Sequence, residues 1–354
     1  MSGSDCLDVA VIGVGQAGLA AGYFLRRTKL SFTLLDDATE PGGAWRHGWD
    51  SLTLFSPASA SSLPGWPMPA PSTGYPPRDA VVGYLAAYEA RYALPVLRPW
   101  RVLAVHREAD ALRLERADGS VLHARHVISA TGNWSNPFIP EIPGRESFRG
   151  RQIHSAQYRD PSGFAGASVI IVGGGNSGAQ ILAEVSRVAA RTAWVTEQPP
   201  VFLPDDVDGA TLFQRATERL LALQAGRSPP PQLGGLGNIV MVPPVREARA
   251  RGVLRALPPF ARLDADGAVW PDGARVAADT IIWCTGFRPA LGHLASLGLT
   301  RRDEVVPVTP LGQALEEPRL WLLGYGEWTG FASATLAGIT RPARAVVQAI
   351  AAGG

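Results

Sequence analysis

Two glycine-rich turns have the spacing that binds the diphosphate of a dinucleotide. The pattern G-x-G-x-x-G occurs at Gly13, Gly15 and Gly18 and again at Gly173, Gly175 and Gly178. Glycines in this pattern permit a tight turn, a close approach of the backbone to a pyrophosphate, and close packing of the next helix on the preceding strand. The N–H groups and the positive dipole end at the start of that helix favour phosphate oxygens. We therefore expect two nucleotide sites in one chain.

The elements expected around the first turn form a complete nucleotide-binding unit. An apolar strand is expected over residues 7–12, and the helix after the turn should bury Ala17, Ala20, Ala21, Phe24 and Leu25. A second strand ends at Asp36 and Asp37, about twenty residues further on, where a carboxylate can accept hydrogen bonds from the ribose hydroxyls of an adenosine. Gln16 and Ala17 join the glycines as candidate cofactor contacts. The alternative, a glycine-rich turn without a ligand, does not account for this order of elements.

The second turn repeats the same order. A strand is expected over residues 168–172, then a helix from Asn176 to Ala190, then a strand that ends at Glu197, with Asn176 and Ser177 as further candidate contacts. Glu197 would repel the 2′-phosphate of NADPH and favour the free ribose of NADH. An arginine that reached the phosphate would reverse this preference, and the candidates are Arg187, Arg191 and Arg215. The second turn is therefore predicted to bind NADPH or NADH, with NADH slightly favoured.

Two further motifs give the chain a family resemblance. The stretch EPGGAWRHGW contains Gly43, Ala44 and Trp45, and F-x-G-x-x-x-H-x-x-x-Y is matched by Phe148, Gly150, His154 and Tyr158. Together with both glycine turns, these motifs resemble the flavin-containing monooxygenase superfamily, in which the Gly-Gly turn passes the diphosphate of FAD. The second motif implies an aromatic connector in front of the nicotinamide turn. We expect His154 to be a buried, hydrogen-bonded structural residue in preference to a general acid.

The resemblance implies other contacts with FAD and the nicotinamide nucleotide. Strand-to-glycine turns supply Ala130, Thr131, Gly132, Thr285 and Gly286, and Val102 would meet the adenine through its backbone. Residues 319–339 resemble the closing FAD segment, a buried strand followed by glycines and then a helix directed at the flavin, with Gly324, Gly326 and Glu327 as candidates. Glu327 stands where many flavoproteins have an aspartate, and it either replaces that residue or is exposed. Pro342 is expected to break or restart the helix.

The fold class that follows is α/β, with two Rossmann-like dinucleotide-binding domains. The FAD-binding domain is expected to be discontinuous, at residues 1–157 and 279–354, with the NAD(P)H-binding domain inserted as residues 158–278. Residues 224–238 are rich in proline and glycine and predict a mobile loop. Tyr84 and Tyr88, at helical spacing, are expected in the core.

By resemblance, the chain is an NAD(P)H-dependent FAD monooxygenase. Such an enzyme reduces FAD, activates O2 as a C4a-(hydro)peroxyflavin, and oxygenates a small soft nucleophile or a carbonyl compound. The candidate catalytic residues are Trp45, Arg46, Ser56, Asn133 and Arg288. Where animal-type relatives have an asparagine associated with the peroxyflavin, Phe55 stands here. Residues 42–69 and 202–216 further resemble flavin monooxygenases encoded beside arsenic-resistance genes (ArsO type).

Two other functions compete with oxygenation. An NAD(P)H oxidase or flavin reductase would release hydrogen peroxide without oxygenating an organic substrate. Phe55 in place of the asparagine favours such a release of peroxide. A nucleotide-binding sensor would not turn over at all. A disulfide reductase needs a redox-active CxxC pair, which this sequence lacks.

Composition narrows the remaining classes. The 354 residues carry 33 Lys and Arg against 31 Asp and Glu, a net charge of +2, so a nucleic-acid surface is not indicated. The two cysteines, Cys6 and Cys284, form neither a zinc motif nor a disulfide framework, and no metal is expected. No apolar run approaches the about 20 residues that cross a membrane. We expect a soluble, cytoplasmic protein that takes a small-molecule substrate, with a homodimer allowed.

Overall fold

The structure is a computed structural model that describes residues 6–231, 234–235, 237–330 and 332–353. The chain forms two compact units, each assembled from separate stretches of sequence. The first unit comprises residues 1–46, 57–136 and 288–354, and the second comprises residues 47–56 and 137–287.

The described part of the first unit contains a seven-stranded sheet. Its strands run in the order β3-β2-β1-β6-β5-β4, and β15 also pairs with β6. The strands are β1 (Cys6–Ile12), β2 (Phe32–Leu35), β3 (Val96–Leu97), β4 (Val102–Arg107), β5 (Leu112–Arg116), β6 (Val121–Ser129) and β15 (Leu320–Leu322). Pairs among β1, β2, β3, β6 and β15 are parallel, whereas β4, β5 and β6 form an antiparallel meander.

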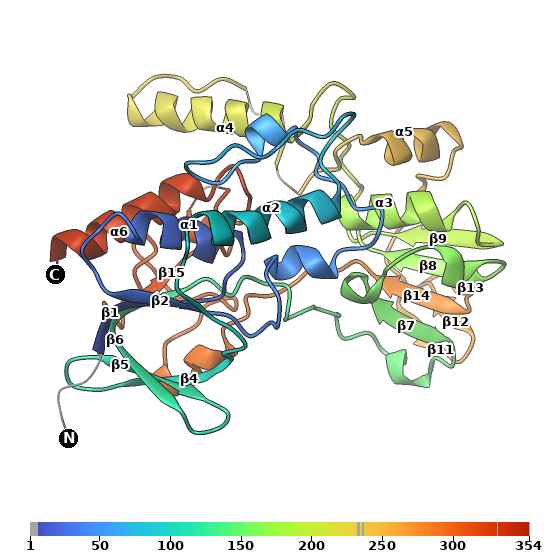
Figure 1. Cartoon of the computed structure of the whole chain (residues 1–354). Helices are drawn as coiled ribbons and strands as arrows, with labels where there is room; N and C mark the ends of the chain where they lie inside the picture. Colours follow the sequence, from blue (N-terminus) through green and yellow to red (C-terminus); the bar gives the residue numbers. More distant parts are fainter. Residues whose placement is uncertain (1–5, 232–233, 236, 331, 354) are drawn as a thin grey trace. The chain divides into compact units, whose positions relative to one another are not determined.

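Three helices cover one face of this sheet (Figure 1). They are α1 (Gln16–Leu25), α2 (Arg78–Arg91) and α6 (Thr340–Gly353), and α1 contacts both of the others. Helix α1 buries Ala17, Ala20, Ala21 and Leu25 as expected, whereas Phe24 is only half-buried. Tyr84 and Tyr88 of α2 are buried as predicted, and their hydroxyls donate to the carbonyls of Trp66 (2.7 Å) and Pro64 (2.5 Å).

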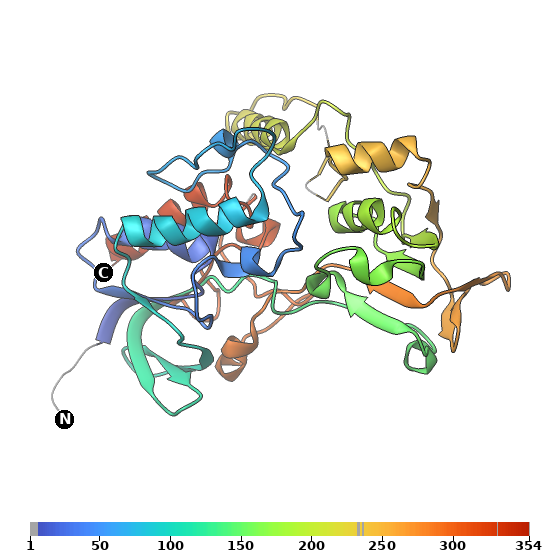
Figure 2. The same ribbon diagram turned by 45° about the vertical axis from the view of Figure 1, so that its right-hand side comes forward.

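Within its described residues, the second unit contains a five-stranded parallel sheet and a three-stranded antiparallel one. The parallel strands, in spatial order, are β10 (Ala256–Leu257), β9 (Arg191–Val195), β8 (Ser168–Val172), β14 (Thr280–Trp283) and β7 (Arg151–His154). The antiparallel strands are β11 (Arg262–Asp264), β12 (Gly267–Val269) and β13 (Arg275–Ala277). The helices are α3 (Asn176–Val185), α4 (Gly209–Gln224) and α5 (Pro243–Ala250), and α5 lies beside α3 in both views (Figures 1 and 2).

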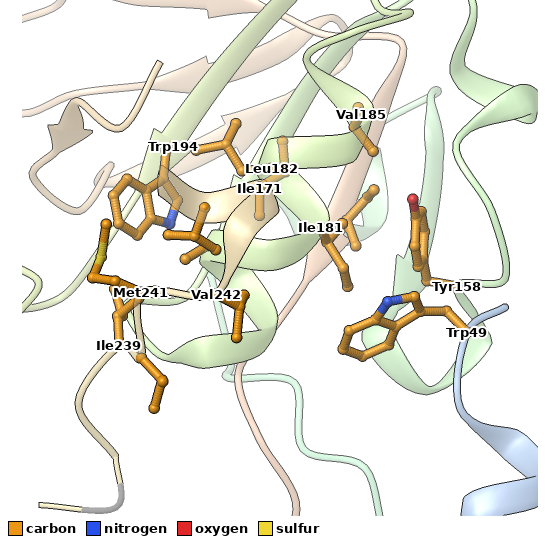
Figure 3. Close-up of a cluster of buried hydrophobic side chains, with 14 of the residues drawn as sticks. Trp49, Tyr158, Ile171, Ile181, Leu182, Val185, Trp194, Ile239, Met241 and Val242 are labelled. Atoms are coloured by element: carbon orange, nitrogen blue, oxygen red, sulfur yellow. The ribbon is translucent and has the colours of Figure 1, made fainter. Parts of the chain in front are cut away.

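The core of the second unit surrounds α3. Ile181, Leu182 and Val185 of that helix pack with Trp194 of β9 and with Tyr158, all at most 2% exposed (Figure 3). Residues 239–242 close another side of this cluster. Burying side chains of this size stabilises each position by roughly 1.5–3 kcal/mol.

The domain boundaries differ from those predicted. Residues 137–157 and 279–287, expected with the FAD-binding domain, belong to the second unit. The physical reason is strand pairing, because β14 lies between β8 and β7 and is hydrogen-bonded to both. Residues 47–56 also belong to the second unit, which the sequence pattern did not indicate.

Other element boundaries also moved. Helix α3 ends at Val185 and not at Ala190, because the chain turns there to enter β9, with the Ala190 N–H donating to the Ala167 carbonyl (2.9 Å). Strands β2 and β9 end at Leu35 and Val195, before the acidic residues that follow them. The helix expected soon after Gly330 begins only at Thr340, so that Pro342 lies in its first turn, where its missing N–H costs no helical hydrogen bond.

No helix in the described ranges has the length and hydropathy needed to cross a membrane.

Candidate functional site

The first glycine turn is shaped by backbone contacts that exclude side chains. Gly13 has a φ of +96°, and a Cβ there would lie 2.6 Å from the Ala130 carbonyl oxygen. A Cβ on Gly18 would collide with the Gly13 carbonyl. Gly15 is the N-cap of α1 and offers no side-chain hydrogen bond to the first N–H groups of the helix. These are the features that a bound diphosphate requires.

The Gly-Gly-x-Trp turn approaches the first turn through backbone alone. Gly43 has a φ of +55°, and a Cβ on it would lie 2.7 Å from the Gly15 Cα. Ala44, next in the chain, is exposed. The two glycine turns leave a space between them that any side chain would fill. Such a space fits the diphosphate of FAD.

Gln16 joins three segments that the sequence assigns to FAD. The Trp45 indole N–H donates to Gln16 Oε1 (3.1 Å), and Gln16 Nε2 donates to the Ala334 carbonyl (2.6 Å) of the closing segment. Gly324 of that segment, at φ +86°, comes so close to α1 that a Cβ would lie 2.6 Å from Ala17 Cβ. Trp45 is therefore held by the predicted site, and its indole proton is engaged within the protein.

The two predicted ribose acceptors have different surroundings. Asp36 is 5% exposed and bonded to Arg98, whereas Asp37 is exposed. Val102, at the start of β4, is 8% exposed, and the Trp100 N–H donates to the Asp36 carbonyl (2.6 Å). Within the described residues, Asp36 is the one of these two carboxylates that is held by another side chain, that of Arg98.

The closing segment is held by buried hydroxyl groups. The Tyr325 hydroxyl lies 2.5 Å from Ser129 Oγ and 2.7 Å from Thr131 Oγ1, and Ser129 Oγ lies 2.9 Å from His293 Nε2. Burial raises the pKa of Tyr325, so this hydroxyl stays protonated. Glu327 is exposed and follows Gly326, which has a φ of +105°. Sequence reasoning missed Tyr325 and His293, because buried polar partners have no signature in spacing.

The burial of His293 predicts that the stability of the first unit depends on pH. Burial, and secondarily the charge of Arg301, lowers its pKa to about 4, below the value near 6.5 of an unfolded histidine. The unfolded chain therefore binds more protons than the folded one below pH 6.5, and stability falls as the pH is lowered. We expect a loss of about 2 kcal/mol from this residue between pH 7 and pH 5. Urea denaturation of wild type and His293→Asn checks this; equal losses in both proteins would contradict it.

The turn after β6 carries the clearest unsatisfied atom of the predicted site. Asn133 Oδ1 is buried and has no hydrogen-bond partner among the described residues. Thr131 Oγ1 donates to the Ala290 carbonyl (2.8 Å), and the Ala290 N–H donates to the Gly132 carbonyl (2.9 Å). A buried acceptor without a partner costs about 1–3 kcal/mol, so Asn133 fits a contact with a bound group.

The other predicted catalytic residues are placed differently. The Arg46 guanidinium pairs with Glu40 (2.6 Å), and that of Arg288 pairs with Glu304 (3.2 Å), so each cation already has a carboxylate partner. Ser56 is 6% exposed and belongs to the second unit, unlike the other four candidates. Phe55, beside it, packs against the core of that unit, and its carbonyl accepts the Gly209 N–H (2.7 Å). Phe55 therefore has a structural role in this fold.

The second glycine turn repeats the steric pattern of the first. Gly173 has a φ of +135°, and a Cβ there would collide with the Cys284 carbonyl. A Cβ on Gly178 would collide with the Gly173 carbonyl, which accepts the Trp194 indole N–H (2.8 Å). Gly175 caps α3 without a side-chain hydrogen bond. This turn therefore also fits a diphosphate.

Both polar atoms of the Asn176 side-chain amide form hydrogen bonds with the protein backbone. Its Nδ2 donates to the Asn238 carbonyl (2.8 Å), and its Oδ1 accepts the Val240 N–H (2.9 Å). It thereby fastens the end of the predicted mobile loop beside the turn, and residues 232, 233 and 236 of that loop lie outside the described residues. Ser177, next to Asn176 in the first turn of α3, is half-buried.

Glu197 is exposed two positions beyond the end of β9. Of the arginines considered for a 2′-phosphate, Arg187 pairs with Glu247 and Arg215 lies 3.8 Å from Glu218. Arg191 is exposed. The Glu197 carboxylate is thus the charged group nearest in sequence to the end of β9. This agrees with the predicted preference for NADH.

The aromatic connector is structural. Phe148 is buried, and a Cβ on Gly150 would lie 2.6 Å from the Asp279 carbonyl oxygen. His154, 2% exposed, accepts the Ala156 N–H at Nδ1 (3.1 Å) and donates from Nε2 to the Gly286 carbonyl (2.9 Å). Burial lowers the pKa of His154, so the ring is neutral. His154 is therefore buried and hydrogen-bonded, as expected.

Two remaining contacts complete the second unit. Tyr158, the last residue of the connector motif, donates from its hydroxyl to Glu184 of α3 (2.7 Å). Thr285 Oγ1 donates to the Phe138 carbonyl (2.5 Å), and Gly286 has a φ of +81°. Both predicted turn residues therefore lie where β14 ends, beside the connector.

Comparison with known proteins agrees with this geometry. A family model described as pyridine nucleotide-disulphide oxidoreductase matches residues 10–225. A solved flavin-containing monooxygenase from Stenotrophomonas maltophilia is 54% identical, covers 99% of each chain and superposes with a TM-score of 0.91. Fold, site and family match thus define an oxidoreductase with two dinucleotide-binding units. The chain belongs to the flavin-containing monooxygenase family, whose members use FAD, NADPH and O2.

Curated relatives are more distant. The uncharacterized oxidoreductase CzcO-like of Geobacillus kaustophilus (strain HTA426) is 35% identical over 208 residues, which cover 58% of this chain and 59% of that protein. The indole-3-pyruvate monooxygenase YUCCA4 of Oryza sativa subsp. japonica is 31% identical over 226 residues, covering 59% and 52%. These alignments span between half and six-tenths of the relatives' lengths.

Proposed function

We propose that this protein is an NAD(P)H-dependent FAD monooxygenase acting on a small soft nucleophile or carbonyl compound. The observation that carries the proposal is the presence of one glycine turn of this kind in each unit. At the first glycine of each turn, Gly13 and Gly173, any Cβ would collide with the backbone. When bound, FAD accepts a hydride from the nicotinamide and activates O2. The chain's own residues bind the two diphosphates, orient Trp45 through Gln16, and present Asn133 Oδ1 as an acceptor.

Rapid mixing of the reduced protein with O2 tests oxygenation against its alternative. A monooxygenase should show a transient absorbance species between reduced and oxidised flavin, with a lifetime that bound NAD(P)⁺ lengthens. Direct return to oxidised flavin with one peroxide per flavin would favour the NAD(P)H oxidase. The absence of an asparagine at position 55 is the observation that keeps this second function in view.

We further propose that the protein prefers NADH to NADPH. The exposed carboxylate of Glu197 after β9 would repel a 2′-phosphate. Measurement of kcat/KM for NADH and NADPH at low ionic strength decides the preference, because added salt screens an exposed charge.

A link to arsenic resistance is also proposed, on the ArsO-type resemblance. Trivalent arsenic prefers two or three thiolates, by the softness argument used for metals. The chain has two cysteines, and both are free. Cys6 is exposed on β1 of the first unit, whereas Cys284 follows β14 in the second. The proposal is therefore oxidation of an organoarsenical at its lone pair, without capture by thiols.

Replacing Cys284 by serine should leave NAD(P)H oxidation within about twofold of wild type. Burial raises the pKa of the Cys284 thiol, which keeps it protonated and a poor nucleophile or ligand. Turnover and flavin content are measured together. Loss of turnover at normal flavin content would contradict this prediction and assign Cys284 a role in the reaction.

Two further points remain proposals. A cytoplasmic location fits two cysteines that form no disulfide, and association as a homodimer is to be tested by light scattering of the purified protein.

A further inference from the structure

A buried ionic triad lies next to the predicted ribose acceptor. The Arg98 guanidinium sits between Asp36, which follows β2, and Glu89 of α2. The side chains of Arg98, Asp36 and Glu89 are 11%, 6% and 18% exposed. All three belong to the first unit.

The hydrogen bonds of the triad fix one carboxylate oxygen and leave the other. Arg98 Nε (2.8 Å) and Nη2 (2.6 Å) both donate to Oδ2 of Asp36. Oδ1 of Asp36 accepts only a long contact from the Ala38 N–H, at 3.4 Å, among the described residues. A carboxylate oxygen with free acceptor capacity is what the donor hydroxyls of a ribose require.

Glu89 in turn fixes the guanidinium. It accepts from Arg98 Nη1 at Oε1 (2.8 Å) and from Nη2 at Oε2 (2.9 Å), a two-pronged arrangement that sets the plane of the arginine. Glu89 therefore orients the Arg98 guanidinium, and Arg98 in turn orients the Asp36 carboxylate.

Stability alone does not account for this arrangement. Buried ion pairs repay their desolvation poorly and are often replaced by apolar residues without loss. The triad also keeps one net negative charge, from two carboxylates and one guanidinium. That charge suits hydroxyl donors and opposes a phosphorylated ribose.

We propose that Arg98 and Glu89 are positioning residues for the adenosine half of FAD, which hold Asp36 so that Oδ1 accepts from the ribose hydroxyls. This inference rests on the proposed function, because the acceptor matters only if FAD binds at the first glycine turn. Neither residue touches the reacting part of the flavin in this assignment, so the effect should appear in binding and not in the chemical step.

The test compares FAD with its 2′-deoxyadenosine analogue. Apoprotein is titrated with each compound, and the ratio of the two Kd values is measured for wild type, Arg98→Met, Glu89→Gln and a control, Arg101→Gln, whose side chain is exposed nearby in the sequence. A ratio cancels any general loss of folded protein. We expect the analogue to bind wild type and the control more weakly than FAD, by about 10-fold. In Arg98→Met the FAD Kd should rise by about 10- to 100-fold and the ratio should approach one.

Glu89→Gln should move the ratio in the same direction by a smaller factor, and it serves if Arg98→Met does not fold. An unchanged ratio in the variants, or a ratio of one in wild type, would overturn the inference while leaving the FAD site intact. If wild-type apoprotein bound no FAD at all, the proposed function itself would fail.

Discussion

Replacement of Gly13 by alanine is expected to yield a colourless protein. The new Cβ would lie 2.6 Å from the Ala130 carbonyl oxygen and 2.8 Å from its carbon, and both atoms are backbone. Gly13 also has a φ of +96°, which an alanine adopts only with strain. Steric overlap and strain together cost on the order of 3 kcal/mol. The turn must shift to relieve them, and FAD must restore its original shape to bind, so we expect FAD to bind about 100-fold more weakly.

The measurement is the ratio of flavin to protein after purification, followed by titration of the apoprotein with FAD. Gly83→Ala is the matched control, because a Cβ on Gly83 of α2 meets no atom within 4 Å among the described residues. The control should be yellow and at least as stable as wild type, since alanine is the better helix former by about 1 kcal/mol. A yellow Gly13→Ala protein with wild-type affinity would remove the first turn from the FAD site.

Replacement of Gly173 by alanine should separate flavin binding from flavin reduction. A Cβ there would collide with the Cys284 carbonyl and lie 2.8 Å from its carbon, at a φ of +135°. Because Gly173 belongs to the second unit, the first glycine turn is untouched. We expect a yellow protein that dithionite reduces normally, with kcat/KM for NAD(P)H lowered by about 100-fold or more.

Stopped-flow measurement of the rate at which NAD(P)H reduces the bound flavin tests this expected loss directly. Gly163→Ala is the control in the same unit, because its Cβ would meet only Arg151 Nη1, at 3.8 Å, among the described residues. The opposite result, loss of FAD with normal nicotinamide binding, would exchange the roles assigned to the two turns.

Local patterns predicted the parts of this protein that depend on near neighbours in sequence. Strand β8 has the predicted bounds, 168–172, and β1 differs from the prediction by one residue. Both glycine turns show the positive φ and the tight contacts that their spacing implied. Such turns can be read from sequence because only glycine tolerates the conformation and the close approach.

Contacts between distant segments could not be read in this way. β14 joins β7 and β8 in one sheet, which moves the domain boundary away from the predicted residues 157 and 279. Phe55, which stands where animal-type relatives are expected to have an asparagine, is partly buried and packs against the core built around α3. Neither result has a periodic signature, because strand pairing and packing are set by residues far along the chain.

The class of protein could be predicted from the glycine spacing alone, because the steric needs of a diphosphate restrict a few glycines to fixed positions. Only the folded chain shows which polar groups near the two turns already have partners within the protein. Asn176 is spent on the Asn238 and Val240 backbone, His154 is neutral between two backbone partners, and Asp36 is chosen over Asp37 by Arg98. A buried polar group is defined by its partners, and those partners come from elements that only folding brings together.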